Sequence, residues 1–455
     1  MLPRGEKVNT TGRLHLLGIG GAGMSALALL LKRRGADVSG TDPAISPILA
    51  AKMTGEGIVV YRAHDPSHLD GVERVVISSA IPEENPELRE ALRRSIPIAH
   101  RVDLLRRLAE GKQLVAVAGT HGKGTTTGML AHLLRQLGWD PSLANGAELV
   151  DDGERCWWGE GVHFVMETDE SDGSFLKLHP QTALITNIDR DHLNFWGDEE
   201  GLRQGFRRFA GAVEGTLILH ESILDLLEGQ VRPVWSYGKG ADCHFRLLEL
   251  QPLEGGAKVT VDTPNGTLHF SICLFGEHNA LNALGAMAIA ASLGVSPERA
   301  AWALSSYRGI RRRLERKGET GGVLVFDDHA DHPTEIARTI AALLPLGRPI
   351  VAVLQPHRFS RVRSLLADYG PALAQAQRVV VLPIWAAGEK IDYQLSDQDL
   401  YLQIHQSNPG QEVHFSPRDT LLPFLRATLS RGEVLLLMGP GDIAEVAERW
   451  EEISA

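Results

Sequence analysis

The stretch AGTHGKGTTTG, residues 118–128, has the composition of a loop that binds nucleotide phosphates. It follows the apolar run LVAVA and precedes the helix-like GMLAHLLRQLG, which is the strand–loop–helix context that such a loop requires. Its backbone N–H groups would cradle the phosphates of ATP, and Lys123 would neutralise the charge that develops during phosphoryl transfer. A glycine turn with a solvated lysine is the less favoured alternative. The loop residues expected to contact ATP are Gly119, Thr120, His121, Gly122, Lys123, Gly124, Thr125 and Thr126.

One position of this loop differs from the usual phosphate-binding pattern. The lysine is normally followed by the hydroxyl residue that holds magnesium, whereas Gly124 follows Lys123 here. Either the loop has lost that ligand, or the hydroxyl of Thr125 has taken its place. The outcome decides whether the chain is an ATP-driven enzyme.

Acidic and imidazole side chains follow the next two apolar runs. Magnesium prefers hard oxygen ligands, usually one or two from the protein with water and phosphate supplying the rest. We expect these side chains to gather at the carboxyl ends of the strands, and a histidine beside such acids is favoured as a metal ligand over a structural role. METDESDGSF contributes Glu167, Asp169, Glu170 and Asp172, and TNIDRDHLNFWG contributes Asn187, Asp191 and His192.

A second glycine turn stands near the N-terminus. GIGGAGMS places Gly18, Gly20 and Gly23 in G-x-G-x-x-G spacing between a strand-like run and the helical MSALALLLKRRG. Glycines let the backbone approach a diphosphate, and a helix N-terminus offers unpaired N–H groups to its charge. Asp42, after the next strand, is placed to bond a ribose hydroxyl. The turn predicts a nucleotide site, although a purely structural glycine turn stays open, and nothing later resembles hydride-transfer machinery.

A basic cluster follows the apolar run PIVAVLQ. LQPHRFSR brings together His357, Arg358 and Arg361. Such a cluster at a strand end suits an anionic substrate or an acyl phosphate, and a solvated loop is the alternative.

The elements that must position these residues are short apolar runs alternating with longer helix-like stretches. The runs are continuous rather than alternating, which favours strands buried on both faces of parallel sheets, and hence an α/β fold. Three blocks are expected, with a β-hairpin around Asn265-Gly266 in the second and SYRGIRRRLE as the link to the third. The runs are RLHLLGIGG, RVVISSAIP, QLVAVAGTHGK, VHFVMETDE, TALITNID, PIVAVLQPH, RVVVLPIW and EVLLLMGPGD.

The overall composition narrows the possible partners and location. The 455 residues suggest two to four domains, and the net charge of −11 argues against binding nucleic acid or anionic membranes. Three scattered cysteines form no disulfide framework, so a reducing cytoplasm is expected. The polar start MLPRGEKVNTTGR has no apolar leader, and no run is long enough for a membrane helix.

Nine segments in order resemble those of the Mur ligases. The resemblance spans nearly the whole chain and implies three α/β domains: a Rossmann-like UDP-sugar domain at 1–108, a central P-loop ATPase domain at 109–311 and a Rossmann-like C-terminal ligase domain at 312–455. The segments are HLLGIGGAGMSALA, SSAIPEENPEL, VAVAGTHGK, ETDESDGSFL, TNIDRDHL, GEHNALNAL, DHPTEIA, LQPHRFSR and MGPGDI.

The same resemblance implies a reaction and its partners. The lactyl carboxylate of UDP-N-acetylmuramate takes the γ-phosphate of ATP to give an acyl phosphate, and the amine of L-alanine then displaces phosphate. A carboxylate is a poor acylating agent until its oxygen becomes a leaving group, and two anions meet only when cations such as Lys123 and Mg²⁺ screen them. We expect a cytoplasmic monomer or homodimer in peptidoglycan precursor synthesis.

The resemblance also assigns roles to individual residues. Lys123, Glu167 and His192 are expected to be catalytic, with Glu167 bridging metal ions and His192 holding the second one. UDP-sugar binding is expected at Gly18, Gly20, Gly21, Gly23, Met24, Ser25, Asp42 and Ser79. Further ATP contacts are expected from the adenine-side residues His278, Asn279 and Asn282, the interdomain Arg313, and Asp328. The substrate or acyl phosphate is expected to meet His329, Asp331, His357, Arg358 and Arg361.

The sequence departs from the family pattern at three places. The usual D-D-Y-G-H-H-P reads DDHADHP, so that His329 replaces a tyrosine and Asp331 replaces a histidine, and Val362 stands where threonine is common. An added acid should weaken binding of an anionic substrate unless a partner compensates for its charge. A related ligase with another acceptor, such as a murein-tripeptide ligase, and a non-catalytic nucleotide-binding relative therefore stay open.

Gly124, in the phosphate loop, also departs from the family pattern. The loop GKGTTT resembles the G-K-G-S and G-K-G-T loops of the folylpolyglutamate synthases, another branch of the superfamily, where the hydroxyl stands one position later. We therefore predict that Thr125 is the magnesium ligand, together with Glu167 and His192.

Overall fold

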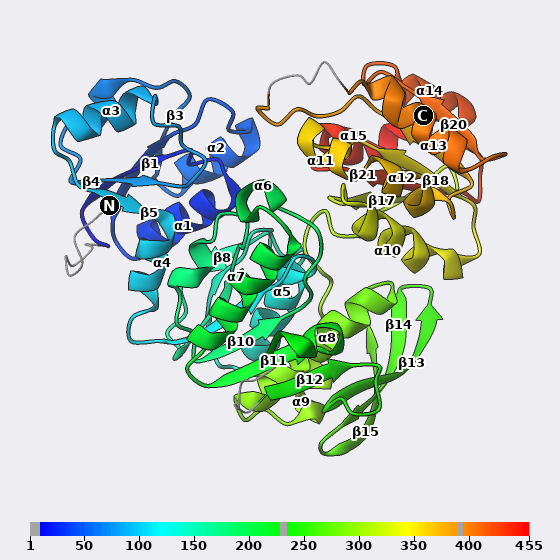
Figure 1. Cartoon of the computed structure of the whole chain (residues 1–455), viewed down its shortest axis with the longest axis horizontal. Coiled ribbons are helices and arrows are strands. Elements are labelled where there is room, and N and C mark those ends of the chain that lie inside the picture. The colour runs from blue at the N-terminus through cyan, green and yellow to red at the C-terminus, as the bar shows by residue number, and fades with distance from the viewer. Residues whose placement is uncertain (1–9, 228–233, 390–394, 455) are drawn as a thin grey trace. The chain divides into compact units, whose positions relative to one another are not determined.

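The computed structural model describes residues 10–227, 234–389 and 395–454 (Figure 1). The start of the chain, which we expected to carry no apolar leader, lies partly outside these residues. The chain divides into two compact units, one made of residues 1–247, 261–268 and 282–307 and the other of residues 248–260, 269–281 and 308–455. None of the described helices combines the length and apolar character needed to cross a bilayer.

The N-terminal part is a five-stranded parallel sheet in the order β3-β2-β1-β4-β5. Its strands are β1 (Arg13–Leu17), β2 (Asp37–Thr41), β3 (Val59–Tyr61), β4 (Arg74–Ile77) and β5 (Ile98–His100). Its helices are α1 (Ala22–Arg33), α2 (Pro47–Gly55), α3 (Pro86–Arg93) and α4 (Arg101–Ala109), with a short 3-10 turn, η1 (Pro66–Leu69).

The two faces of this sheet belong to separate hydrophobic cores. Leu14 and Leu16 of β1 pack in one core with α1 and α4, whereas Leu17 packs in the other with α3. Successive side chains of a strand point to opposite faces, so covering both faces requires the continuous apolar runs seen in the sequence.

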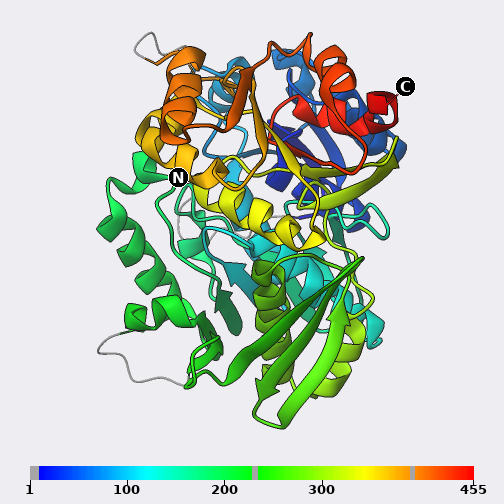
Figure 2. The same cartoon turned by 90° about the vertical axis from the view of Figure 1, so that its right-hand side faces the viewer.

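The central sheet has ten strands in the order β15-β14-β13-β12-β11-β10-β6-β9-β7-β8. The long strands β13, β14 and β15 form one end of it (Figure 2). Pro264 and Asn265 lie between β14 and β15, and Gly266 begins β15, as the expected hairpin requires. The strands are β6 (Gln113–Ala118), β7 (Ser142–Ala144), β8 (Cys156–Trp157), β9 (His163–Glu167), β10 (Thr182–Ile185), β11 (Thr216–His220), β12 (Val234–Gly238), β13 (Phe245–Leu253), β14 (Gly256–Thr263) and β15 (Gly266–Ile272).

The central part also contains five helices and two 3-10 turns, which are interspersed among these strands in the chain. They are α5 (Lys123–Gln136), α6 (Leu193–Trp196), α7 (Glu199–Ala212), α8 (Glu277–Ser292) and α9 (Pro297–Leu304), with the 3-10 turns η2 (Ser174–Lys177) and η3 (Glu221–Leu227). Helix α7 packs Phe206 and Phe209 on Ala116 and Ala118 of β6 and on Ile185 of β10.

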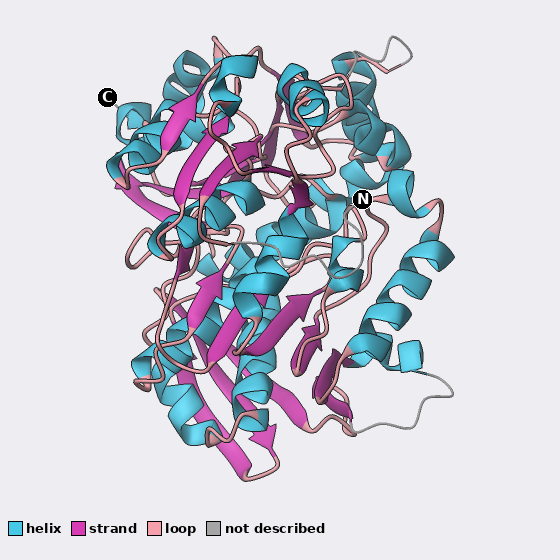
Figure 3. Ribbon diagram, turned by 90° about the vertical axis from the view of Figure 1, so that its left-hand side faces the viewer, coloured by secondary structure: helices cyan, strands magenta, loops and turns pink. Residues whose placement is uncertain are grey.

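The C-terminal sheet has the order β16-β17-β21-β18-β19-β20, and only the edge strand β16 runs antiparallel to its neighbour. Its strands are β16 (Glu315–Thr320), β17 (Val323–Asp328), β18 (Ile350–Leu354), β19 (Arg378–Val381), β20 (Glu412–Phe415) and β21 (Val434–Met438). Helices on both faces cover it: α10 (Pro333–Leu343), α11 (Phe359–Ser364), α12 (Leu366–Leu373), α13 (Asp397–Ser407), α14 (Leu421–Thr428) and α15 (Ile443–Glu448), with η4 (Leu344–Leu346) and η5 (Trp450–Ser454). The described chain is a mixture of helices and strands throughout (Figure 3).

The α/β prediction is thus confirmed, and each of the eight apolar runs contains a strand of a largely parallel sheet. The polar residues that follow β1, β6, β9, β10 and β18 lie at the carboxyl ends of those strands. Ligands of open α/β sheets bind at that edge.

Glu87, in the first turn of α3, is a fully buried carboxylate that ties this N-terminal sheet together. It accepts a hydrogen bond of 2.8 Å from the hydroxyl of Thr41 and contacts Nδ1 of both His64 and His68. Burial acts to raise the pKa of Glu87, but hydrogen bonds from His15 and these three residues outweigh it and lower the pKa from 4.5 to about 2.

The Glu87→Gln variant tests this network through the pH dependence of stability. The folded-state pKa lies below the unfolded one, so the stabilisation is complete above about pH 4.5 and is lost as the pH falls towards 2; it amounts to about 3 kcal/mol. We expect urea denaturation to show wild type more stable than the variant at pH 7, with the gap narrowing between pH 5 and pH 3. The exposed Glu83→Gln variant is the control, and a gap independent of pH would contradict the assignment.

Candidate active site

The phosphate loop joins β6 to α5 and contains two glycines that no other residue could replace without strain. Gly119 and Gly122 have φ of +130° and +80°, a backbone region that disfavours side chains. A Cβ on Gly119 would collide with the hydroxyl of Thr186, and one on Gly122 would lie 2.7 Å from Oδ1 of Asn282. The loop therefore keeps its backbone close to the segment after β10 and to α8. It joins a strand to a helix, as the sequence predicted.

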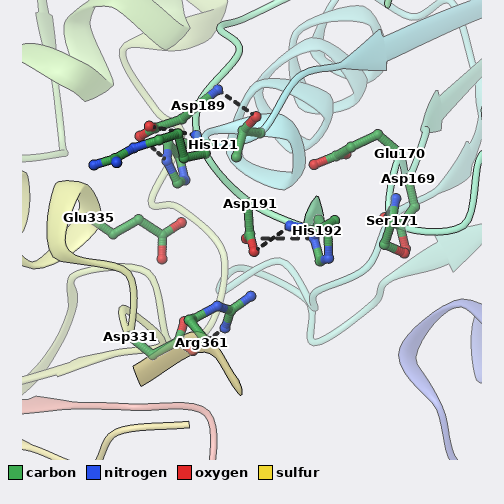
Figure 4. Close-up of polar contacts among 12 residues, drawn as sticks. His121, Asp169, Glu170, Ser171, Asp189, Asp191, His192, Asp331, Glu335 and Arg361 are labelled. Carbon is green, nitrogen blue, oxygen red and sulfur yellow. Dashed lines mark hydrogen bonds and ion pairs between the residues drawn. The ribbon is translucent and has the colours of Figure 1, made fainter. Parts of the chain in front are cut away.

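The segment after β10 holds the loop in shape. Asn187 Oδ1 accepts a hydrogen bond from the backbone N–H of His121 at 3.0 Å, and the hydroxyl of Thr186 donates to the carbonyl of His121 at 2.6 Å. The backbone N–H of Asp189 donates to the Thr120 hydroxyl at 3.0 Å, and the Asp189 carboxylate faces Nε2 of His121 at 2.9 Å (Figure 4). Side chains thus fix the loop, and α5 begins just beyond the carboxyl end of β6, a position that favours an anion.

Lys123 is a buried ammonium at the first position of α5. Its Nζ donates to the carbonyls of Gly119 and Thr120, at 2.6 and 3.1 Å, and to Glu170 Oε2 at 2.9 Å. Burial acts to lower the pKa of Lys123, but the charges of Glu170, Asp169 and Glu167 outweigh it and raise the pKa. Burial raises the pKa of Glu170 to about 7 against the opposing charge of Lys123. The lysine is therefore held charged at the mouth of the loop.

The predicted acids come together at the end of β9. Glu167 Oε2 accepts a hydrogen bond of 2.6 Å from the N–H of Gly146, which follows β7. Asn145 donates through Nδ2 to the carbonyl of Gly124 at 3.2 Å, and this links the same turn to the phosphate loop. Asp172 accepts hydrogen bonds from the hydroxyl of Ser79 at 2.6 Å and the N–H of Ser174 at 2.9 Å, so it serves the junction with the N-terminal sheet.

Several oxygens around the loop are buried and have no hydrogen-bond partner within the described part of the chain. They are Thr126 Oγ1, Thr127 Oγ1, Asn145 Oδ1 and Glu170 Oε1, and Thr125 is itself only 7% exposed. Buried polar atoms are usually paired, and unpaired ones mark places where an ion, water or ligand is missing. Oxygen donors of this kind fit a hard cation such as Mg²⁺ with its nucleotide.

His192 sits before the short helix α6 with φ of +55°, an uncommon conformation for a residue with a side chain. Its N–H donates to Asp191 Oδ1 at 2.8 Å, and its Nε2 lies 3.5 Å from Asp191 Oδ2 (Figure 4). Trp196, at the end of the same helix, donates through Nε1 to the carbonyl of Glu170 at 3.1 Å. The histidine is therefore fixed to the acid cluster in a conformation of the kind that functional sites retain.

The N-terminal glycine turn has the predicted form, and Asp42 braces it. Gly18 has φ of +71°, and Gly20 donates its N–H to Asp42 Oδ2 at 2.9 Å. The other carboxylate oxygen accepts the N–H of Ala44 at 2.9 Å. Further along α1, the hydroxyl of Ser25 accepts a hydrogen bond of 3.1 Å from Arg155. The remaining predicted sugar-nucleotide residues, Gly21, Gly23 and Met24, lie in the same turn and at the start of α1.

The second unit gathers the residues of the basic loop around Asp331. Arg361 forms an ion pair with Asp331 (Figure 4). His357 Nδ1 lies 3.4 Å from the same carboxylate. Burial acts to raise the pKa of Asp331, but its hydrogen bond with His357 and the charge of Arg361 outweigh it and lower the pKa. The acid gained at this position is therefore neutralised by its neighbours. The side chain of Arg358 is exposed.

Among the other predicted residues of the second unit, Asp328 and Asn279 are buried, whereas Arg313, His278 and His329 are partly exposed. Burial lowers the pKa of His329 to about 3 and that of His278 to about 4, so both imidazoles are neutral. Asp328 accepts the N–H groups of Leu314 and Ala330, each at 2.7 Å, and burial raises its pKa to about 6. Arg313 pairs with Glu335 at 3.2 Å, and Asn279 donates to the carbonyl of Phe275 at 2.9 Å.

Comparison with known proteins identifies the family. The chain matches three descriptions in succession: "Mur ligase family, catalytic domain" over residues 13–113, "Mur ligase middle domain" over 117–290 and "Mur ligase, glutamate ligase domain" over 312–441. The chain belongs to the Mur ligase family, whose three-domain α/β architecture it has.

Individual relatives match over nearly their whole length. The chain is 42% identical to UDP-N-acetylmuramate–L-alanine ligase of Rubrobacter xylanophilus, covering 96% of this chain and 98% of that one. It is 40% identical to the ligase of the same name from Kineococcus radiotolerans, covering 97% and 96%. The crystal structure of UDP-N-acetylmuramate-alanine ligase from Thermotoga maritima aligns with a TM-score of 0.83 at 26% identity, covering 97% of this chain and 98% of that one.

Two residues of the site carried little sequence signal. Glu170 stood in the acid cluster, but its pairing with Lys123 follows from the turn after β9. Asn145 follows a three-residue strand and belongs to no motif, so only the fold brings it to Gly124.

The Glu170→Gln variant should destabilise the protein, because it leaves the buried charge of Lys123 without its hydrogen-bonded carboxylate. Removing one partner of a buried ion pair costs about 3 kcal/mol or more, so we expect a loss of that size in the free energy of unfolding by urea at pH 7. The Glu199→Gln variant removes a carboxylate of an exposed pair with Arg190 and is the matched control. Equal stability of the two variants would show that Lys123 does not depend on Glu170.

Proposed function

We propose that this chain is the ATP-dependent ligase that joins L-alanine to the lactyl carboxylate of UDP-N-acetylmuramate in cytoplasmic peptidoglycan precursor synthesis. The observation that carries the proposal is the full-length identity of 42% to a ligase of that name, together with an intact phosphate loop. Residues 1–108 bind the UDP-sugar, residues 109–311 bind ATP and residues 312–455 complete the ligase, which acts as a monomer or homodimer.

The chemistry follows from the charges at the loop. The lactyl carboxylate attacks the γ-phosphate of ATP, ADP leaves, and the resulting acyl phosphate is attacked by the amine of L-alanine with release of phosphate. Both reacting groups of the first step are anions, so a fixed cation at the loop lowers their repulsion. Lys123, kept charged by Glu170 and pre-oriented by two carbonyls, supplies that cation.

Mg²⁺ would be held by Thr125, Glu167 and His192. Bound there, the ion supplies charge neutralisation of the phosphate oxygens. Supporting this assignment, Glu167 is fixed by Gly146 and His192 by Asp191, so both side chains are oriented in advance. The unpaired oxygens at the start of α5 add donors for the nucleotide and its waters. Gly124 in this account is a variant of a working loop.

The remaining assignments follow the parts of the fold. The turn of Gly18, Gly20, Gly21 and Gly23 with Met24, Ser25, Asp42 and Ser79 binds the UDP-sugar. His278, Asn279, Asn282, Arg313 and Asp328 complete the ATP site. The substrate or acyl phosphate meets His329, Asp331, His357, Arg358 and Arg361.

Asp331 stands where the family pattern has a histidine. Its negative charge is compatible with an anionic substrate because Arg361 and His357 compensate that charge. The neutral imidazole of His329 likewise adds no charge where a tyrosine is usual. A ligase with another acceptor is therefore the weaker alternative.

A phosphate-release assay tests the function and the acceptor together. With ATP, magnesium and UDP-N-acetylmuramate present, we expect phosphate release to require an amino acid and to be fastest with L-alanine in a panel that includes glycine, L-serine and a murein tripeptide. Lys123→Ala should abolish the release, because no other cation of the loop replaces it. Release that ignores the amino acid would sink the proposal, and a preference for the tripeptide would favour the alternative ligase.

The role of Thr125 is tested by the Thr125→Val variant, which keeps the shape of the side chain and removes the oxygen. We expect the magnesium concentration for half-maximal phosphate release to rise by roughly tenfold or more, about the effect of losing one hydrogen bond or ligand to a charged group. Thr125→Ser keeps the oxygen and should restore most of the affinity. An unchanged magnesium dependence in Thr125→Val would assign the ligand elsewhere.

A further inference from the structure

Two residues of the segment that precedes β16 have an uncommon backbone conformation. Arg312 and Leu314 have φ of +60° and +49°, in the left-handed region that residues with a side chain rarely adopt. Such conformations persist only where surrounding contacts hold them, and they occur often at functional sites. The residue between them is Arg313, which the proposed function assigns to ATP.

Arg312 is held by its side chain and by both of its backbone polar groups. Its Nε donates to Asp327 Oδ2 at 3.2 Å, and its Nη2 donates to the carbonyl of Gly439 at 2.5 Å. Its backbone N–H donates to Glu315 Oε2 at 2.9 Å, and its carbonyl accepts the N–H of His329 at 2.7 Å. These contacts fix both the backbone of Arg312 and its guanidinium.

Asp327, near the end of β17, is the buried partner of this guanidinium. Its side chain is only 1% exposed, and its Oδ1 is buried and accepts no hydrogen bond from any residue that the structure describes. Burial raises the pKa of Asp327 to about 6 against the opposing charge of Arg312. A buried carboxylate is unfavourable unless an opposite charge pairs with it, so Asp327 requires Arg312 at this place.

Leu314, on the other side of Arg313, is held by the next residue of β17. Its N–H donates to Asp328 Oδ2 at 2.7 Å, and its side chain is buried. The backbone on both sides of Arg313 is thus tied to consecutive carboxylates of one strand. The side chain of Arg313 itself is 39% exposed and pairs with Glu335. The segment therefore presents Arg313 on a backbone that its neighbours hold fixed.

We propose that Asp327 and Arg312 are positioning residues of the ligase, which hold the backbone that directs Arg313 towards ATP. This inference rests on the proposed function and extends it to two residues to which no substrate contact is assigned. Asp327 acts through Arg312, and Arg312 acts through the backbone that it shares with Arg313. Binding of ATP therefore depends on a buried ion pair that does not itself touch the nucleotide.

Phosphate release by the full-length protein, with UDP-N-acetylmuramate and L-alanine saturating, tests the inference through the KM for ATP. Arg312→Met should raise this KM by about tenfold or more and change kcat by less than about threefold, because a misplaced binding group weakens ground state and transition state alike. Asp327→Asn keeps the size of the side chain and one acceptor oxygen, so it should give a smaller increase.

Combination with Arg313→Met separates positioning from a merely structural role. Arg313→Met alone should raise the KM for ATP by about 10- to 100-fold, the effect of losing a charged hydrogen bond. Adding Arg312→Met should then raise it by less than about a further twofold, because the group to be positioned is gone. Arg313→Lys replaces Arg313→Met in this comparison if the latter releases no measurable phosphate.

Arg316→Met is the matched control, because Arg316 is exposed in the adjoining strand β16, and it should leave the KM unchanged. Urea denaturation reports that each variant is folded. If Arg312→Met does not fold, Arg312→Gly takes its place, because glycine adopts φ of +60° without strain and loses only the side-chain contacts. The same increase in KM is expected for it.

Three results would overturn the inference and leave the proposed function intact. They are an unchanged KM for ATP when Arg312 is replaced, an increase that is fully retained in the Arg313→Met background, and a wild-type KM in Arg313→Met itself. A wild-type protein that releases no phosphate with both substrates present would overturn the proposed function, and this inference with it.

Discussion

The buried ammonium of Lys123 is the constraint on which the rest of the site depends. An unpaired charge cannot stay in a protein interior, so two backbone carbonyls and Glu170 must be brought to it. The carbonyls come from the loop itself, which requires Gly119 and Gly122 in conformations that other residues avoid. Glu170 lies in the turn after β9, and its backbone carbonyl accepts a hydrogen bond from Trp196. The loop conformation that requires the two glycines is therefore also the one that brings the carbonyl partners to the Lys123 ammonium.

Polar contacts also connect the segments around the loop to the N-terminal sheet. Asp172 follows the acid cluster and accepts the Ser79 hydroxyl, while Arg155 beyond β7 donates to Ser25 at the start of α1. Arg33 of α1 also pairs with Glu154 at 3.0 Å. These contacts join the N-terminal sheet to the central sheet within one compact unit. Their common feature is that polar side chains at or near the carboxyl ends of the strands also connect the two sheets.

Local sequence was sufficient to predict the strands and helices and the functional loops that follow them. Continuous apolar runs identified the parallel strands, and glycine spacing identified both turns, because these signals depend on neighbours in the chain. Contacts between distant segments were not predictable in the same way. Asn145 belongs to no motif, and only the fold brings it to Gly124. The fixed role of Asp42 in bracing the turn, and the pairing of Glu170 with Lys123, likewise required three-dimensional placement.

The ion pair between Asp331 and Arg361 also constrains how this chain can change over evolutionary time. The usual histidine at position 331 would bring a second imidazole beside His357 and remove the carboxylate that neutralises Arg361. A change of Asp331 to histidine would therefore leave the positive charge of Arg361, beside His357, without the carboxylate that offsets it here. The residue at position 331 thus sets the net charge of this cluster while Arg361 and His357 keep their places beside it.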